Sequence, residues 1–152
     1  MAQHSASRRP LAELKLLASP DLIPTAKRTA AALGSLVGFG VEDLDDLNIA
    51  VAQACDQAIE AGIEKFGDEA TLKLSFWETE QGIEVDVQAL PGRSPHGRAQ
   101  ERALAEHHRA HHEREDAVDR IAHDMIRLFV DDFRPSVARN RVRFRMVKYL
   151  IG

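Results

Sequence analysis

The chain has 152 residues, of which 44% are hydrophobic and 29% charged, the composition of one globular domain. Its net charge of −4 argues against a general nucleic-acid binder, and its single cysteine, Cys55, excludes an intramolecular disulfide and a cysteine-based zinc site. It contains no run of about 18 apolar residues and no signal-like apolar segment. These features predict a cytoplasmic protein that does not enter a membrane.

The N-terminal half predicts a strand followed by two helices. Residues 1–10 are polar and are expected to form a disordered tail, and residues 11–18 alternate as a strand does. Ser19-Pro20-Asp21 begins a helix that ends at Gly34, Gly38 and Gly40. A second helix begins at Val41 and ends at Gly67. Its predicted apolar face consists of Leu44, Leu47, Val51, Ala54, Cys55, Ala58 and either Ala61 or Gly62.

The C-terminal half predicts a hairpin, a long loop, a helix and a last strand. Residues 71–77 and 83–87 alternate and form the hairpin. Residues at about 90–115 are rich in His, Arg and Glu and predict a lid-like loop with a weak helix. A helix is expected over 116–133, closed by Pro135, and a strand over 139–150. The inward side of this helix is predicted to carry Val118, Ile121, Ala122, Met125, Leu128 and Phe129.

This order of elements predicts a single α/β domain over 11–152. The strands occur both as a hairpin and separated by helices, which favours a mixed sheet with helices on one face, a two-layer α/β sandwich. Cys55 and the phenylalanines Phe66, Phe76, Phe129 and Phe144 are interpreted as core residues. Trp77 points opposite to Phe76 and could lie in an interface.

Arginines mark one face of the last strand. Arg141, Arg143 and Arg145 alternate with apolar residues, and Arg134, Arg139 and Lys148 are near in sequence. They could form a docking surface for an acidic partner, or an exposed sheet face whose charges discourage edge pairing. Both readings stay open on the sequence alone.

Four histidines have a spacing that could bind a metal. His107 and His111, and likewise His108 and His112, are four residues apart and would share a helix face. The stretch has few apolar residues to hold a rigid helix, and a structural metal site needs four ordered ligands. We therefore predict no physiological metal site, with these four histidines as the candidates if one exists.

Three segments, 16–33, 46–60 and 142–150, resemble the GHKL (Bergerat-fold) ATP-binding domain, and more narrowly the bacterial anti-sigma factor serine/threonine kinases. The resemblance covers nearly the whole chain. It implies a two-layer sandwich that binds Mg-ATP between a helix motif, a Gly-rich turn and a lid. It also implies a homodimer whose partners are a sigma factor or an anti-anti-sigma (STAS) protein.

The chain departs from the helix motif of that family, Glu-Ala-x-x-Asn-Ala-x-x-His. In the family the Glu is the base that activates the attacking hydroxyl, and the Asn holds Mg²⁺. The corresponding positions here are Gln53, Gln57 and Ala61. A glutamine amide cannot accept a proton at useful pH, so Gln53 cannot act as a general base. The carbonyl oxygen of Gln57 could still contact a cation.

The Asp-x-Gly-x-Gly motif, whose Asp binds the adenine amine, is also changed. Its Asp position falls on Ala89, and only Gly92 remains of the glycines. Asp86 is an odd number of residues away, so it is expected to face the other side of the sheet. The lid hinge is affected as well, since Gly97 is the last glycine before the predicted helix at 116.

These three changes predict a regulatory protein that binds partners without kinase activity and needs no cofactor. The alternative is an active serine/threonine kinase that binds Mg-ATP in a rebuilt site, with Asp56 or Glu60 as the base. A second alternative is a sensor of a metal or a small molecule. For the helix face that carries Gln53 and Gln57, three states are considered: an empty cleft, a pocket for another ligand, and residual ATP binding.

Overall fold

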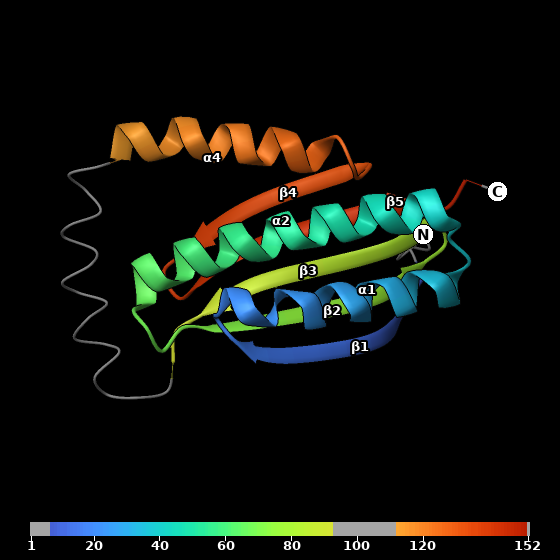
Figure 1. The fold of residues 1–152 in the computed structure, drawn as a ribbon, viewed down its shortest axis with the longest axis horizontal. Coiled ribbons are helices and arrows are strands. Elements are labelled where there is room, and N and C mark those ends of the chain that lie inside the picture. Colours follow the sequence, from blue (N-terminus) through green and yellow to red (C-terminus); the bar gives the residue numbers. More distant parts are fainter. Residues whose placement is uncertain (1–6, 93–111, 152) are drawn as a thin grey trace, which may run out of the picture.

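Five strands form one antiparallel sheet, and the helices cover one face of it (Figure 1). The computed structural model describes residues 7–92 and 112–151, with side chains from residue 119 onward in the second range. The strands are β1 (Arg8–Leu17), β2 (Thr71–Thr79), β3 (Gly82–Leu90), β4 (Asp132–Ala138) and β5 (Arg141–Tyr149). The helices are η1 (Pro20–Leu22), α1 (Ile23–Val37), α2 (Val41–Phe66) and α4 (His112–Arg127). None of these helices is long and apolar enough to span a membrane.

The two-layer sandwich is confirmed, but the expected mixed sheet is wrong. Every described strand pair is antiparallel, in the order β1-β2-β3-β5-β4. A single helix between two strands would return the chain for a parallel pairing. Here the chain reverses three times, from β1 to α1, from α1 to α2 and from α2 to β2, so β2 runs antiparallel to β1 (Figure 1).

The ends of the first two helices lie close to their predicted positions. The Ser19 hydroxyl accepts a hydrogen bond from the amide of Asp21 at 3.4 Å, which caps η1 before α1 begins at Ile23. Gly38 ends α1 with φ at 115°, a left-handed conformation that glycine adopts without steric cost. Gly67 follows the last residue of α2 as predicted.

The core lies between α2 and the inner face of the sheet. Most of the predicted face of α2 is buried, with Gly62 rather than Ala61, but Leu44 is only half-buried. The buried face also includes Ala50 and Ile59, which were not predicted. Cys55 is fully buried in it, and burial raises the pKa of its thiol to about 12, so the cysteine is a core residue as predicted. The sheet contributes Leu72, Leu74, Phe76, Ile83, Val85, Val87, Ala89, Val142, Phe144 and Met146.

The helix predicted over 116–133 is wrong at both ends. It begins earlier, at His112, and ends at Arg127, and the strand β4 follows it. Pro135 lies inside β4 and does not close the helix. β4 pairs only with β5 and is therefore an edge strand, where a missing backbone N–H can be tolerated. The last predicted strand is confirmed as β5.

The predicted inward face of this helix is also wrong in part. Ile121, Met125 and Leu128 are exposed, whereas Ala122, Ile126 and Val130 are buried. Both sets recur at helical spacing, so periodicity alone could not choose between them. The position of the sheet beneath α4 decides which set is covered.

Two predicted boundaries shift. β1 begins at Arg8, so the last three residues of the predicted tail belong to the strand. Leu90 and residues 112–115, predicted as the two ends of the lid-like loop, belong to β3 and α4 instead. The central part of the predicted loop, residues 93–111, lies outside the described residues.

His123 of α4 lies between two rings of the core. Its ring centroid is 5.3 Å from that of Phe133 and 5.5 Å from that of Phe144. Burial lowers the pKa of His123 below its usual 6.5; Arg127 acts in the same direction, and Asp119 and Asp124 oppose it. The packing of α4 on the sheet therefore favours the neutral imidazole.

We expect the free energy of unfolding to fall as the pH drops from 6.5 towards the lower pKa of folded His123. In this window the unfolded chain binds a proton at this histidine that the folded chain does not. Urea unfolding of the wild type and of His123→Gln, followed over this pH range, measures the effect. The variant should show the smaller loss of stability, because other groups titrate equally in both proteins. Equal losses of stability in the two proteins would contradict the assignment of this pH dependence to His123.

Candidate functional site

The positions of the family's helix motif lie along one flank of α2. Gln53 and Gln57 are half-buried and one turn apart. Asp46 precedes Gln53 by seven residues, which is about two turns, and therefore shares this flank. Since α2 also packs against α4, the neighbours of Asp46 show which way the flank faces.

Lys148 connects this flank with the end of α4. Its Nζ donates to the carbonyl oxygen of Phe129 at 3.1 Å and lies 3.8 Å from carboxylate oxygens of both Asp43 and Asp46. The flank with Gln53 therefore faces α4. Lys148 had been grouped with the arginines of β5, and this is wrong, because it lies on the helix side of the sheet.

The end of the helix motif lies directly over the position that corresponds to the adenine-binding Asp. A Cβ atom at Gly62, next to Ala61, would lie 2.7 Å from the Cβ of Ala89. Ala89 is fully buried at this contact. The position predicted from the resemblance to correspond to that Asp thus carries a methyl group, at a point where helix and sheet approach each other closely.

Gly92 is held by a different close contact. A Cβ atom there would lie 2.4 Å from the carbonyl oxygen of Glu69, in the turn before β2. Only glycine fits beside this backbone. The structure thus gives Gly92 a packing role, and it brings Ala61, Ala89 and Gly92 to the same end of the molecule, where α2 and β3 both end (Figure 1).

Asp86 faces away from this region, as predicted. It lies on the outer face of the sheet, where Arg143 Nη2 donates a hydrogen bond to its Oδ2. Asp86 is only 1% exposed although no helix covers this face. The same bond raises the pKa of Arg143 above its usual value, which keeps the guanidinium charged.

Glu84 lies one pleat along the same strand and has two arginine partners. Arg8 Nη1 donates to its Oε2 at 2.5 Å, and Arg145 donates to its Oε1. Arg8 also lies over the ring of Trp77, with 4.4 Å between Cζ and the ring centroid. Trp77, proposed from the sequence as an interface residue, therefore already contacts a cation of its own chain.

These contacts bear on the predicted arginine surface. Arg143 and Arg145 are both paired with acids of β3, and Arg134 pairs with Asp132 at 3.2 Å. Arg139 and Arg141 are exposed. The centre of the outer face is therefore neutralised within the chain, which weakens the reading of a basic docking surface.

Glu84 and Asp86 were not singled out from the sequence, although a signal for them exists. Acids alternate along 84–86 and arginines along 141–145, which is the pattern of two paired strands with complementary charges. It becomes visible only once β3 and β5 are known to be neighbours.

The remaining candidates are the histidines proposed as metal ligands and the acids proposed as alternative bases. His107, His108 and His111 lie outside the described residues, and the structure gives only the backbone of His112. The described residues contain no group of three possible metal ligands. Asp56 and Glu60, the alternative bases, are exposed on α2. Chemically, this flank of α2 offers the side-chain amides of Gln53 and Gln57. The position predicted for the family's base, Gln53, therefore carries no carboxylate.

Comparisons with known proteins agree with the resemblance. No protein-family model matches the chain. It is 30% identical over 78 residues to the serine-protein kinase RsbW of Bacillus pumilus, which is 51% of this chain and 48% of that protein. RsbW of Bacillus licheniformis is 27% identical over 75 residues, 49% of this chain and 47% of its own length. The chain spans about half the length of the curated relatives it matches.

A solved structure supports the fold. The crystal structure of the RsbU and RsbW domains of Rv1364c from Mycobacterium tuberculosis matches 93% of this chain and 35% of its own, with a TM-score of 0.52. The sequence identity is 14%, so the match supports the architecture alone.

Proposed function

Because this chain is related to the RsbW serine-protein kinases of the GHKL family, we propose that it is an anti-sigma-type regulator that acts by binding proteins. Its partner is a sigma factor or an anti-anti-sigma protein of the STAS type, and it works in the cytoplasm as a homodimer. Binding removes the free partner by mass action. No phosphotransfer is part of this mechanism, and no nucleotide cofactor is required.

The observation that carries the proposal is the contact between Ala89 and Gly62. A carboxylate that reads an adenine amine needs space and a polar surrounding, and this position offers neither. An adenine placed here would lose the hydrogen bond to its amine, which costs about 1–3 kcal/mol.

The flank of α2 supports the same conclusion independently. Gln53 replaces the base and cannot accept a proton from an attacking serine. Gln57 is one methylene longer than the asparagine it replaces, so a cation bound by its carbonyl oxygen would have to move. Loss of both groups removes the proton acceptor and alters the metal position.

We expect calorimetric titration with Mg-ATP and Mg-ADP to give no binding heat up to millimolar nucleotide. A paired variant, Gln53→Glu with Gln57→Asn, restores two family residues but leaves Ala89, and it should also bind no nucleotide. Size-exclusion chromatography with purified sigma and STAS proteins would then detect the partner directly.

Micromolar nucleotide binding by the wild type would overturn the non-catalytic proposal. The active-kinase alternative would then be tested with Asp56→Asn and Glu60→Gln, since loss of phosphotransfer in either variant identifies the base.

A further inference from the structure

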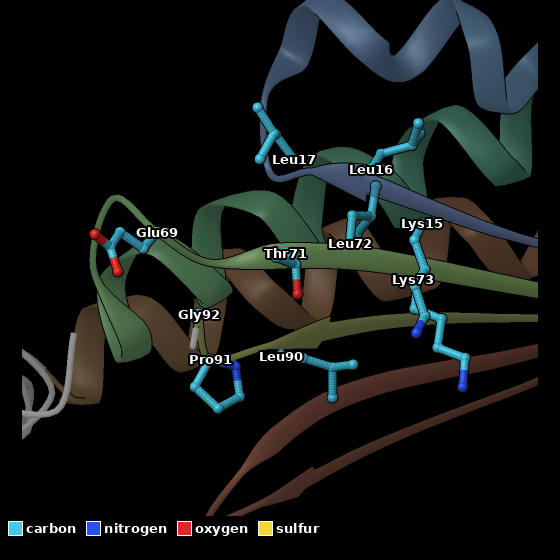
Figure 2. A pocket seen from close by; sticks show the side chains of 10 residues that line it. All are labelled: Lys15, Leu16, Leu17, Glu69, Thr71, Leu72, Lys73, Leu90, Pro91 and Gly92. Atoms are coloured by element: carbon cyan, nitrogen blue, oxygen red, sulfur yellow. The ribbon is translucent and has the colours of Figure 1, made fainter. Parts of the chain in front are cut away.

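A pocket of about 580 Å³ opens on the outer face of the sheet, where β1 ends, β2 begins and β3 ends (Figure 2). Its size is typical of small-molecule sites. Leu17, Thr71 and Leu90 form one row across the three strands, since Leu17 pairs with Thr71 and Thr71 with Leu90. The pocket lies on the opposite side of the sheet from α2, away from Gln53 and Gln57.

The floor of this pocket is apolar. Leu17 is 69% exposed, an unusual state for a leucine within a strand, and Leu90 and Pro91 beside it are only half-buried. Gly92 completes the wall through its close contact with Glu69. An apolar group placed here would remove this surface from water, which is favourable.

Two residues further along β1 and β2, the next pair of outward-facing side chains consists of two lysines. Lys15 and Lys73 are direct cross-strand partners, and like charges at such positions repel one another. Lys73 Nζ is 3.1 Å from Glu13 Oε1, whereas Lys15 forms no ion pair with any described residue. Among the residues that the structure describes, this end of the pocket therefore carries one positive charge without an ion-pair partner. Glu69 lies at the opposite end (Figure 2).

We propose that this pocket binds a small organic carboxylate with an apolar body. The carboxylate lies between the ammonium groups of Lys15 and Lys73, where it relieves their repulsion. The body covers Leu17, Leu90 and Pro91. A dianionic phosphate would lose more hydration than a carboxylate on entering this largely apolar pocket, and only one lysine without an ion-pair partner in the described part of the chain is present to offset that cost. Of the positions assigned to the family's nucleotide motifs, only Gly92 lines this pocket, and the proposed binding uses the lysines and the apolar side chains, so the inference does not depend on the proposed function.

The test uses phenylbutyrate as the probe and the ¹⁵N-labelled chain in solution NMR. Shift changes are expected at the amides of 15–17 and 71–73 and at those of Leu90 and Gly92, with a dissociation constant on the order of 1 mM for so small a ligand. Lys15→Gln should weaken binding about tenfold, because a charge-assisted hydrogen bond is lost. Lys27→Gln, an exposed lysine on α1, is the matched control and should bind like the wild type.

Two further ligands separate the contributions. Phenylbutanol has the same body without the charge, and phenylphosphate is a dianion. Both should bind at least about tenfold more weakly than phenylbutyrate. Equal binding of the alcohol, or shift changes centred on Arg143 and Arg145 instead of on the pocket, would overturn the proposal.

Discussion

Replacing Arg143 by alanine should lower the free energy of unfolding by about 3 kcal/mol. Asp86 is almost fully buried, and Arg143 is the residue that donates a hydrogen bond to its carboxylate. Its other oxygen, Oδ1, accepts no hydrogen bond within the described part of the chain. Without the guanidinium, the folded state would hold a buried charge with no partner. Urea unfolding measures the loss.

Replacing the partner residue, Asp86, should lower the free energy of unfolding by less. Asp86→Ala leaves Arg143, whose side chain is 26% exposed and can turn towards water, so we expect a loss of about 1.5 kcal/mol. Arg141→Ala is the matched control, since Arg141 lies on the same strand and face but is exposed, and should change stability by less than about 0.5 kcal/mol. Equal effects of the Arg143 and Arg141 variants would show that the pair contributes little.

Replacing Gly62 by valine should destabilise the protein by about 3 kcal/mol. Even the first carbon of a side chain would lie 2.7 Å from the Cβ of Ala89, so α2 would have to move away from β3. The contact lies within the core, where close packing leaves little room for adjustment. Thermal and urea unfolding would both report the change.

Two variants test whether the close contact is the cause. Gly40→Val is the control, because no atom lies within 4 Å of a Cβ at this position before α2, and it should cost much less. Ala89→Gly should recover part of the loss when it is combined with Gly62→Val. Without such recovery, the low helix propensity of valine would be the better explanation.

The two predictions concern opposite sides of β3. Ala89 faces α2 and Asp86 faces the outer surface, as the alternation of side chains along a strand requires. Ala89, predicted to correspond to the family's adenine-binding Asp, and the acids Glu84 and Asp86 therefore belong to different surfaces. Asp86 cannot replace the missing carboxylate without reversal of the strand.

Local signals in the sequence determined α1, α2 and the β2–β3 hairpin. Caps such as Ser19 and Gly38, and apolar residues repeating every two or every three to four positions, depend on neighbours along the chain and can be read directly. The outward facing of Asp86 could be predicted in the same way from the alternation of side chains along β3.

Long-range packing decided the rest. The antiparallel pairing of β1 and β2 depends on the second helix, which adds one more reversal of the chain than a single helix would. The buried face of α4 depends on where the sheet lies. Pro135 is acceptable in β4 only because β4 is an edge strand. Because β5 lies beside β3, Arg143 pairs with the buried Asp86 and is not free to serve as the predicted docking residue. Each of these properties depends on contacts between residues distant in sequence, and local patterns of hydrophobicity and charge do not encode those contacts.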